Sequence, residues 1–276
     1  MASRLEADLH CRQREYRFHG KMTLRVSLGI CMAIFAWLVA SCGKVDQRAD
    51  LVFLNGAEPE TLDPAIITGQ PEGRIVNALF EGLCAYDENG QPSPGVAESW
   101  EISPDGKTYT FHIRTNAKWS DGFPLKAQDF VKSWHHTLKP ETGSQYNYQL
   151  YPIKNAQAFA EGKLADFSEV GVHAVDARTL RVDLENPTSY FLQLCAFPTL
   201  HPLPVDLIKR VGDDWVKPAN IISNGAYTLE TWRINDKIRL RKNTHYWDSA
   251  NVALETIDVL PISDANVAFN FYASGL

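Results

Sequence analysis

The sequence predicts an α+β fold, a mixed α/β arrangement of antiparallel hairpins and helices, from three observations. Short segments in which polar and apolar residues alternate come in pairs around turn residues, which is the pattern of β-hairpins. Other segments, such as 127–138, place apolar residues at helical spacing. No strand–helix–strand unit carries a glycine-rich phosphate motif, so nucleotide binding is not indicated.

The first 41 residues differ from the rest of the chain in charge and hydropathy. Basic residues between Arg14 and Arg25 precede an uncharged, mostly apolar run of 15 residues, 26–40. This run is shorter than the ~20 residues that a helix needs to cross a bilayer, so residues 1–41 are predicted to be a signal peptide. Met22 is a more natural start than Met1 because it leaves a short basic region, and the first 21 residues are then a mis-called start.

Cys42 is predicted to carry a lipid. Val39-Ala40-Ser41-Cys42 resembles the lipobox of bacterial lipoproteins, and the alternative is an ordinary signal peptide with a chance cysteine. Acyl chains on the thiol would hold the protein on a membrane, with the polar residues 42–50 as a tether. Beyond residue 41 the chain has 21 basic and 30 acidic residues, and this acidic body disfavours nucleic-acid binding.

The first elements of the body follow from apolar runs and from residues that break them. Residues 51–54 are predicted to be a short strand ahead of the turn-rich segment 56–59. Residues 71–84 are predicted to be a helix and 91–95, rich in proline, a loop. The apolar stripe of that helix consists of Ile75, Val76, Leu79, Phe80 and Leu83.

The middle of the chain alternates hairpins with helices. Strands 99–102 and 108–114 flank a Pro-Asp-Gly turn, and the alternation in the second strand points Tyr109, Phe111 and Ile113 to one face. Pro140 ends a helix at 127–138, and Gly162 ends one at 151–162. The later elements are a hairpin at 170–175 and 179–184, helices at 189–197 and 204–211, a hairpin at 226–232 and 237–241, and a strand at 256–261.

Residue pairs that are able to carry chemistry have simpler interpretations. His135 and His136 point about 100° apart on a helix, so they cannot chelate one metal together, and one is expected near the core and the other in solvent. Asp213-Asp214 is interpreted as a turn or helix start. Without a Gly-x-Ser-x-Gly elbow or another nucleophile–base constellation, the sequence assigns no catalytic residue, no metal and no cofactor.

Two cysteines remain once the head is removed and Cys42 is lipidated. A disulfide between Cys84 and Cys195 is chemically allowed outside the cytoplasm, and two buried free thiols are the alternative, because spacing cannot show proximity. Aromatic residues are numerous and suit a sugar- or peptide-binding cleft, although each by itself is more typical of a core. They are Trp119, Trp134, Tyr146, Tyr148, Tyr151, Tyr190, Tyr227, Tyr246 and Trp247.

Motifs in a fixed order connect the chain with a known family. They are 58–64 (EPETLDP), 79–83 (LFEGL), 94–100 (PGVAESW), 118–122 (KWSDG), 224–227 (NGAY) and Tyr246-Trp247. With these blocks the sequence resembles the extracellular solute-binding proteins of family 5, and most of all the oligopeptide-binding branch of peptide ABC transporters. Turn chemistry explains Trp119 and Asp121 as scaffold residues, and Asn224-Gly225 is interpreted as a backbone that reaches positive φ.

The resemblance implies a fold like that of class II periplasmic binding proteins. Lobe I would be discontinuous and incomplete, 51–80 with 205–276, and an inserted subdomain would occupy 81–204. Residues 270–276 resemble the family segment just before the chain crosses to the second lobe, which is missing from this sequence. A peptide would be held between the lobes by backbone pairing, and hinge closure would present the loaded protein to a permease.

The resemblance also implies ligand-binding residues. The loop Thr68-Gly69-Gln70 matches the family loop that touches the peptide backbone, although Thr68 replaces an acid of close relatives. Tyr146 matches a cleft-facing tyrosine of the inserted subdomain, and Asn224 and Tyr227 lie where the first lobe meets the cleft.

The function implied is that of a monomeric, lipid-anchored binding protein of the periplasm or cell envelope, with no enzymatic activity. It would capture oligopeptides and deliver them to the permease subunits of an ABC importer. The same scaffold would alternatively bind a nickel chelate, an oligosaccharide or a murein peptide, and other classes are a secreted hydrolase or a surface interaction protein. Because half a cleft leaves a ligand solvated, the 276-residue chain is expected to bind peptide weakly or not at all.

Overall fold

The computed structural model describes residues 48–275 of the chain. The predicted signal peptide, the lipid on Cys42 and most of the tether lie outside these residues and stay predictions. Within 48–275, no helix is long and apolar enough to cross a membrane. These residues form two four-stranded sheets, one two-stranded sheet and several helices, which confirms the predicted mixture of hairpins and helices.

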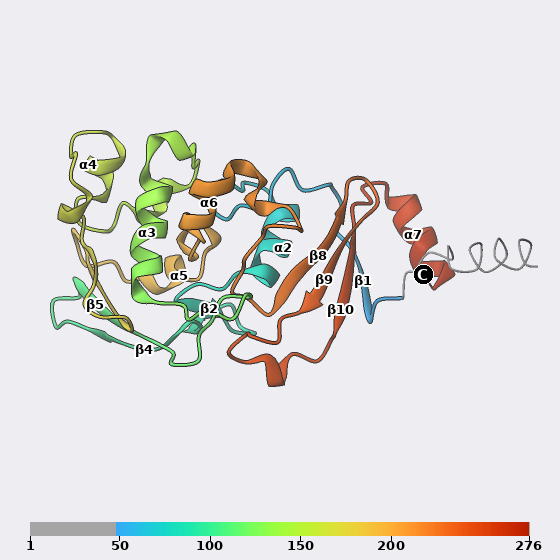
Figure 1. Ribbon diagram of the computed structural model, residues 1–276, viewed down its shortest axis with the longest axis horizontal. Coiled ribbons are helices and arrows are strands. Elements are labelled where there is room, and N and C mark those ends of the chain that lie inside the picture. Colours follow the sequence, from blue (N-terminus) through green and yellow to red (C-terminus); the bar gives the residue numbers. More distant parts are fainter. Residues whose placement is uncertain (1–47, 276) are drawn as a thin grey trace, which may run out of the picture. The chain divides into compact units, whose positions relative to one another are not determined.

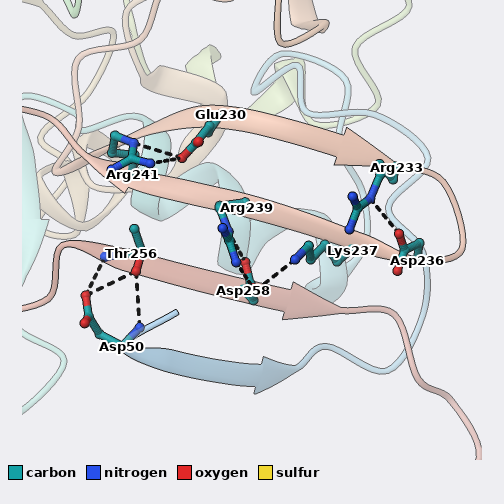
Figure 2. Close-up of polar contacts among 9 residues, drawn as sticks. All are labelled: Asp50, Glu230, Arg233, Asp236, Lys237, Arg239, Arg241, Thr256 and Asp258. Atoms are coloured by element: carbon teal, nitrogen blue, oxygen red, sulfur yellow. Dashed lines mark hydrogen bonds and ion pairs between the residues drawn. The ribbon is translucent and has the colours of Figure 1, made fainter. Parts of the chain in front are cut away.

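The first sheet joins the two ends of the described chain. Its strand order is β1-β10-β9-β8, in which β1 runs parallel to β10 and the other neighbours are antiparallel. The Asp50 carboxylate accepts hydrogen bonds from the backbone N–H groups of Glu255 (2.9 Å) and Thr256 (2.8 Å), which fixes where β1 begins (Figure 2). The bounds are β1 Leu51–Leu54, β8 Tyr227–Arg233, β9 Lys237–Lys242 and β10 Thr256–Leu260.

The second four-stranded sheet has the order β4-β5-β7-β6 and is antiparallel throughout. Tyr109, Phe111 and Ile113 on β5 are all buried, as their alternation predicts. A separate ribbon pairs β2 with β3. The bounds are β2 Cys84–Tyr86, β3 Pro92–Pro94, β4 Ala97–Ile102, β5 Thr108–Ile113, β6 Val172–Ala174 and β7 Thr179–Asp183.

The helices cover these sheets. Figure 1 shows α2 beside β8, and α3, α4 and α5 on the side of β4 and β5. Helix α3 has the predicted bounds, and at its start the Asp129 carboxylate accepts the backbone N–H of Lys126 at 2.9 Å. The bounds are α2 Gln70–Leu79, α3 Ala127–Leu138, α4 Ala156–Ala160, α5 Phe191–Cys195, α6 Val205–Val211 and α7 Ala265–Ser274.

Two hydrophobic cores stabilise the described residues. We number them in the order in which the chain enters them, so that the first core begins with Leu62. The second core comprises the buried apolar residues from Leu83 to Leu200, among them Phe111, Phe130 and Trp134. The chain passes from the first core to the second after Phe80 and returns before Leu203. The first core contains Leu62, Ala65, Ile67, Ile75, Val76, Leu79, Phe80, Leu203, Val205, Leu207, Trp215, Leu229, Ile238, Leu240 and Val259.

Helix α2 ends at Leu79, so the predicted helix 71–84 is too long at its C-terminal end. Phe80 is already extended (φ −129°, ψ 151°), and the Leu79 carbonyl accepts the N–H of Gly225 at 2.7 Å. Leu83, the last residue of the predicted apolar stripe, lies beyond the end of the helix and packs in the second core. Tertiary contacts that the local pattern does not contain therefore end the helix.

Other differences from the predicted elements have similar causes. The predicted loop 91–95 contains β3, which pairs with β2. The predicted helix 151–162 reduces to α4, because Ile153 forms a bridge with Leu184 and Asn155 has a positive φ of 62°. Helix α7 was not predicted, and none of its described side chains is buried.

Gly225 has a different role from the predicted one. Its φ is not positive, in contrast to those of eight other glycines of the described chain. A Cβ atom at this position would lie 2.6 Å from the Leu79 carbonyl carbon and 2.7 Å from the Phe80 nitrogen. Gly225 is therefore needed for the close approach of two backbone segments rather than for a left-handed turn.

Candidate functional site

The main candidate site is a cavity of about 450 Å³ bordered by segments next to both cores, with Ile67 of the first core in its lining. Ligand pockets typically enclose roughly 300–1,000 Å³, so this volume suits a small molecule or a few residues of a peptide. One side is formed by the loop before α2 and by α2 itself, and the other by aromatic residues from the second core region. The lining consists of Ile67, Thr68, Gly69, Gln70, Gly73, Arg74, Asn77, Tyr86, Tyr146, Phe197 and Pro198.

Asp63 stabilises the turn that leads into the loop at 68–70. The Asp63 backbone carbonyl accepts the N–H groups of Ile66 and Ile67 at 3.1 Å each, and the side chain accepts from Trp215 Nε1 at 3.2 Å. Burial raises the pKa of Asp63 to about 6, while the hydrogen bonds from Ala65 and Trp215 act in the opposite direction. The EPETLDP motif thus supplies a buried anchor for the loop.

Gly69 lets the loop lie directly on the first turn of α2. It occupies the N-cap position, and a Cβ atom there would lie 2.2 Å from Oε2 of Glu72. The other oxygen of Glu72 accepts the backbone N–H of Glu60 at 3.0 Å, so this carboxylate ties the motif to the start of the helix. A carboxylate in the first helical turn is also favoured by the helix dipole.

The opposite wall is aromatic. The Tyr146 and Phe197 rings pack edge to face with their centroids 6.0 Å apart. Tyr146 Oη reaches the Thr68 carbonyl oxygen at 3.4 Å, a long hydrogen bond across the cavity. Tyr86 Oη donates to the Gln193 carbonyl at 3.0 Å, which fixes that ring at the rim.

Arg74 is the one charged residue in the lining. Its guanidinium donates to the Asn55 carbonyl (3.1 Å) and to Gln70 Oε1 (3.2 Å) and lies 5.8 Å from the centre of the Phe53 ring. These contacts hold the charge on the α2 side. The lining residues offer aromatic faces, amides and backbone groups, which can hold an extended chain without selecting one side-chain charge.

Four of the six predicted ligand-binding residues meet at this cavity: Thr68, Gly69, Gln70 and Tyr146. Asn224 and Tyr227 are not in its lining. The Asn224 side chain is buried and bonds both backbone groups of Glu81, at 3.2 and 2.9 Å. Tyr227 Oη donates to the Leu254 carbonyl at 3.3 Å. Both residues form hydrogen bonds within the fold in this structure, and their predicted contact with a ligand stays a prediction.

Comparison with known proteins places the chain in a family. The family model described as bacterial extracellular solute-binding proteins, family 5 (middle), matches residues 91–275. The chain belongs to this family. The oligopeptide-binding protein OppA of Salmonella typhimurium is 43% identical over 258 residues, which cover 91% of this chain and 47% of that protein.

Further relatives agree with this family-5 membership. The murein peptide-binding protein MppA of Escherichia coli is 42% identical over 231 residues, 83% of this chain and 42% of that protein. The structure of Haemophilus influenzae OppA in complex with the peptide RPPGFSPFR matches with a TM-score of 0.79 and 38% identity, over 84% of this chain and 45% of that one. The chain thus spans about half the length of these relatives.

The comparison bears on the predicted fold class. Solved structures of periplasmic binding proteins match at TM-scores of 0.78–0.79, so the fold predicted from the family resemblance is confirmed. The two cores separate between Phe80 and Leu83 and again between Leu200 and Leu203.

Sequence reasoning missed seven lining residues of this family-5 chain: Ile67, Gly73, Arg74, Asn77, Tyr86, Phe197 and Pro198. Arg74 and Asn77 lie on the polar side of the helix whose apolar stripe was recognised, so the same periodicity marks them as facing away from the core. Tyr86 and Phe197 come from distant segments, and no local pattern indicates that they meet.

The LFEGL motif places a carboxylate where the chain crosses between the cores. Glu81 accepts hydrogen bonds from Tyr246 Oη (2.5 Å) and Trp247 Nε1 (2.6 Å), so the YW motif holds it. Burial raises the pKa of Glu81 to about 7 although both hydrogen bonds lower it. Arg114 stacks on Trp247 with its guanidinium carbon 3.6 Å from the ring centre. The motif therefore has a structural role, and we call Glu81 with its partners Asn224, Tyr246 and Trp247 the joint.

The remaining candidates occupy structural positions. His135 stacks on Phe167 with ring centroids 4.3 Å apart, and both it and His136 are half-buried, so the predicted division into a core and a solvent histidine is wrong. Asp213-Asp214 lies in a 3₁₀ turn at 212–216, consistent with the predicted turn or helix start. Within 48–275, no three His, Cys, Asp or Glu residues are grouped so as to hold a metal ion.

Proposed function

We propose that the whole protein captures oligopeptides in the periplasm for delivery to an ABC importer, and that this chain supplies one part of its ligand cleft. The observation that carries the proposal is the 450 Å³ cavity, whose loop 68–70 and aromatic wall match a binding role in a chain 43% identical to an oligopeptide-binding protein. Residues 51–80 with 205–276 would be lobe I, and 81–204 the inserted subdomain. The positions where the two cores separate support this division.

The lining suggests how the peptide is held. Thr68, Gly69 and Gln70 would offer backbone groups to the ligand's main chain, and Tyr146 and Phe197 would offer flat surfaces to its side chains. Because main-chain groups are common to all peptides, such a site tolerates many sequences. With no nucleophile–base pair in its lining, the cavity is proposed to bind its ligand without a reaction and without a cofactor.

A murein peptide is the second candidate ligand. It is favoured by the 42% identity to a murein peptide-binding protein, which is close to the identity to the oligopeptide-binding relative. Anchoring through a lipid on Cys42, a monomeric state and a permease partner complete the proposal.

Native mass spectrometry of the protein purified from cells tests the function. We expect co-purified short peptides, released on denaturation and identified by sequencing. Murein-derived peptides alone would support the second candidate, whereas a sugar, a metal chelate or peptide turnover would contradict the proposal. The 276-residue chain by itself is expected to show weak or no heat signal with a mixed tripeptide library, and micromolar affinity would contradict this expectation.

A further inference from the structure

Two cysteines far apart in sequence meet beside the candidate site. Cys84 is the first residue of β2 and Cys195 the last residue of α5, and both side chains are fully buried free thiols in the structure. Their backbones converge at Gly82, where a Cβ atom would lie 2.2 Å from the Cys195 carbonyl oxygen and 3.1 Å from that of Cys84. Strand β2 and helix α5 are in contact, so the two cysteines lie on elements that pack together. This arrangement brings two sulfur atoms together across a separation of about 110 residues.

The buried pair is chemically protected in the folded chain. Burial, and after it the contact with Cys84, raises the pKa of Cys195 well above its ordinary value, so the reactive thiolate is scarce. Neither sulfur is exposed to a catalyst or oxidant in solution. Any oxidation must therefore take place while the chain folds, before α5 closes over β2.

We propose that Cys84 and Cys195 form a disulfide as the protein folds in the periplasm, a step that relies on the location proposed above. The donor is an oxidised thiol–disulfide oxidoreductase. One cysteine thiolate attacks a donor sulfur and forms a mixed disulfide, and the other thiolate then displaces the donor. Both cysteines lose their protons and together two electrons, while the donor disulfide gains them and leaves as a dithiol.

The bond would brace the candidate site. Tyr86 and Phe197, which line the cavity, each follow one of the cysteines by two residues. The hydrogen bond from Tyr86 Oη to the Gln193 carbonyl already joins the same two segments on the rim side. A covalent link between β2 and α5 would fix the spacing of these two aromatic side chains. It would also close a loop that contains almost the whole second core.

Peptide mapping decides whether the bond exists. The full chain is exported in cells, denatured without reductant in the presence of an alkylating agent, digested and examined by mass spectrometry. We expect one disulfide-linked peptide pair that contains Cys84 and Cys195, which disappears when reductant is added first. Alkylation of both cysteines without reductant would overturn the proposal, and so would a link from either of them to a cysteine of another molecule.

Stability gives a second readout. Because the closed loop is long, the oxidised protein is expected to melt on the order of 10 °C higher than protein unfolded and refolded with dithiothreitol. The Cys84→Ala/Cys195→Ala variant is the matched control, since its melting temperature must not respond to dithiothreitol. An equal response of variant and wild type would overturn the assignment. If the variant does not fold, the peptide map alone still decides. Peptide co-purification is measured separately, so a failure of the proposed function is distinguishable.

Discussion

Asp258 and Arg239 form a buried ion pair in the first sheet, and removal of one partner is expected to destabilise the chain strongly (Figure 2). Arg239 Nε lies 2.6 Å from Oδ1 of Asp258 and Arg239 Nη2 lies 2.7 Å from Oδ2, so the contact is bidentate. The two side chains are only 8% and 9% exposed. Lys237 Nζ adds a third contact at 3.3 Å.

The expected magnitude follows from this geometry. In Asp258→Ala, the Arg239 guanidinium would stay buried without its carboxylate, which typically costs about 3–5 kcal/mol in the free energy of unfolding. Replacement of both residues, as in Arg239→Met/Asp258→Leu, is expected to cost less, because the buried guanidinium is removed together with its carboxylate and only the longer contact of Lys237 is lost. Glu230 and Arg241 on the same sheet form an exposed pair, with the arginine 53% exposed, and Glu230→Ala is expected to cost less than about 1 kcal/mol.

Urea unfolding followed by circular dichroism measures these differences, provided that the slope of free energy against urea is the same for all variants. The expected order of destabilisation is Asp258→Ala first, the double variant second and Glu230→Ala last. A loss below about 1 kcal/mol for Asp258→Ala would refute the reasoning. A double variant as unstable as the single one would refute it too, since the cost would then come from lost packing.

Three further expectations concern the joint between the cores and the cavity. The pKa of Glu81 is about 7 in the folded chain against an ordinary 4.5, so the folded chain holds this proton more tightly than the unfolded chain does. The resulting contribution to the free energy of unfolding is complete below pH 4.5, and at most about 3 kcal/mol of it is lost as the pH rises to about 7. The stability difference between wild type and Glu81→Gln should fall over that interval in urea titrations, and a flat difference contradicts the assignment. Gly225→Ala should destabilise the chain by about 1–3 kcal/mol, because the new Cβ atom would meet backbone 2.6 Å away. Gly73→Ala in α2 is the control, since its Cβ atom has open space and the substitution should be neutral or stabilising. Equal effects of the two substitutions in thermal unfolding would contradict this prediction. Tyr146→Ala should reduce the peptide that co-purifies with the full-length protein about tenfold, and Tyr148→Ala, outside the lining, should not, as native mass spectrometry can check.

Local patterns predicted those elements that their own residues determine. Helix α3 has an amphipathic stripe and a proline after its end, so its bounds follow from the sequence alone. Strand β5 likewise buries every second residue. The end of α2 was mispredicted because the residues that stop it, Asn224 and Gly225, are about 145 positions away. A contact across that separation leaves no trace in a window of ten or twenty residues.

The residues of the candidate site likewise divide into those that a motif predicts and those whose place depends on contacts between distant segments. The loop 68–70 was found through its match to the family loop, and Asp63 before it and Glu72 after it hold the segment in place. Tyr86 was assigned to no site, because its place in the lining depends on β2 meeting α5. Asn224 was placed at the cleft because its motif is typical of the family, but its amide is used to bond the backbone of Glu81. A motif identifies a residue that the fold needs without saying whether a ligand needs it.

The two walls of the cavity are held at their spacing mainly by contacts that lie outside the cavity rather than by contacts across it. Among the described lining residues, only the long hydrogen bond from Tyr146 to Thr68 connects the two sides. Other contacts between the core regions lie around Glu81, where Asn224 bonds its backbone and the Tyr246-Trp247 motif bonds its carboxylate. Further ones are the hydrogen bonds of Ser120 with Ser223 and of Leu203 with Ser133, both at 2.7 Å. We therefore expect substitutions at Glu81, Tyr246 or Trp247, none of which lines this cavity, to change the distance between the walls and with it the affinity for a ligand.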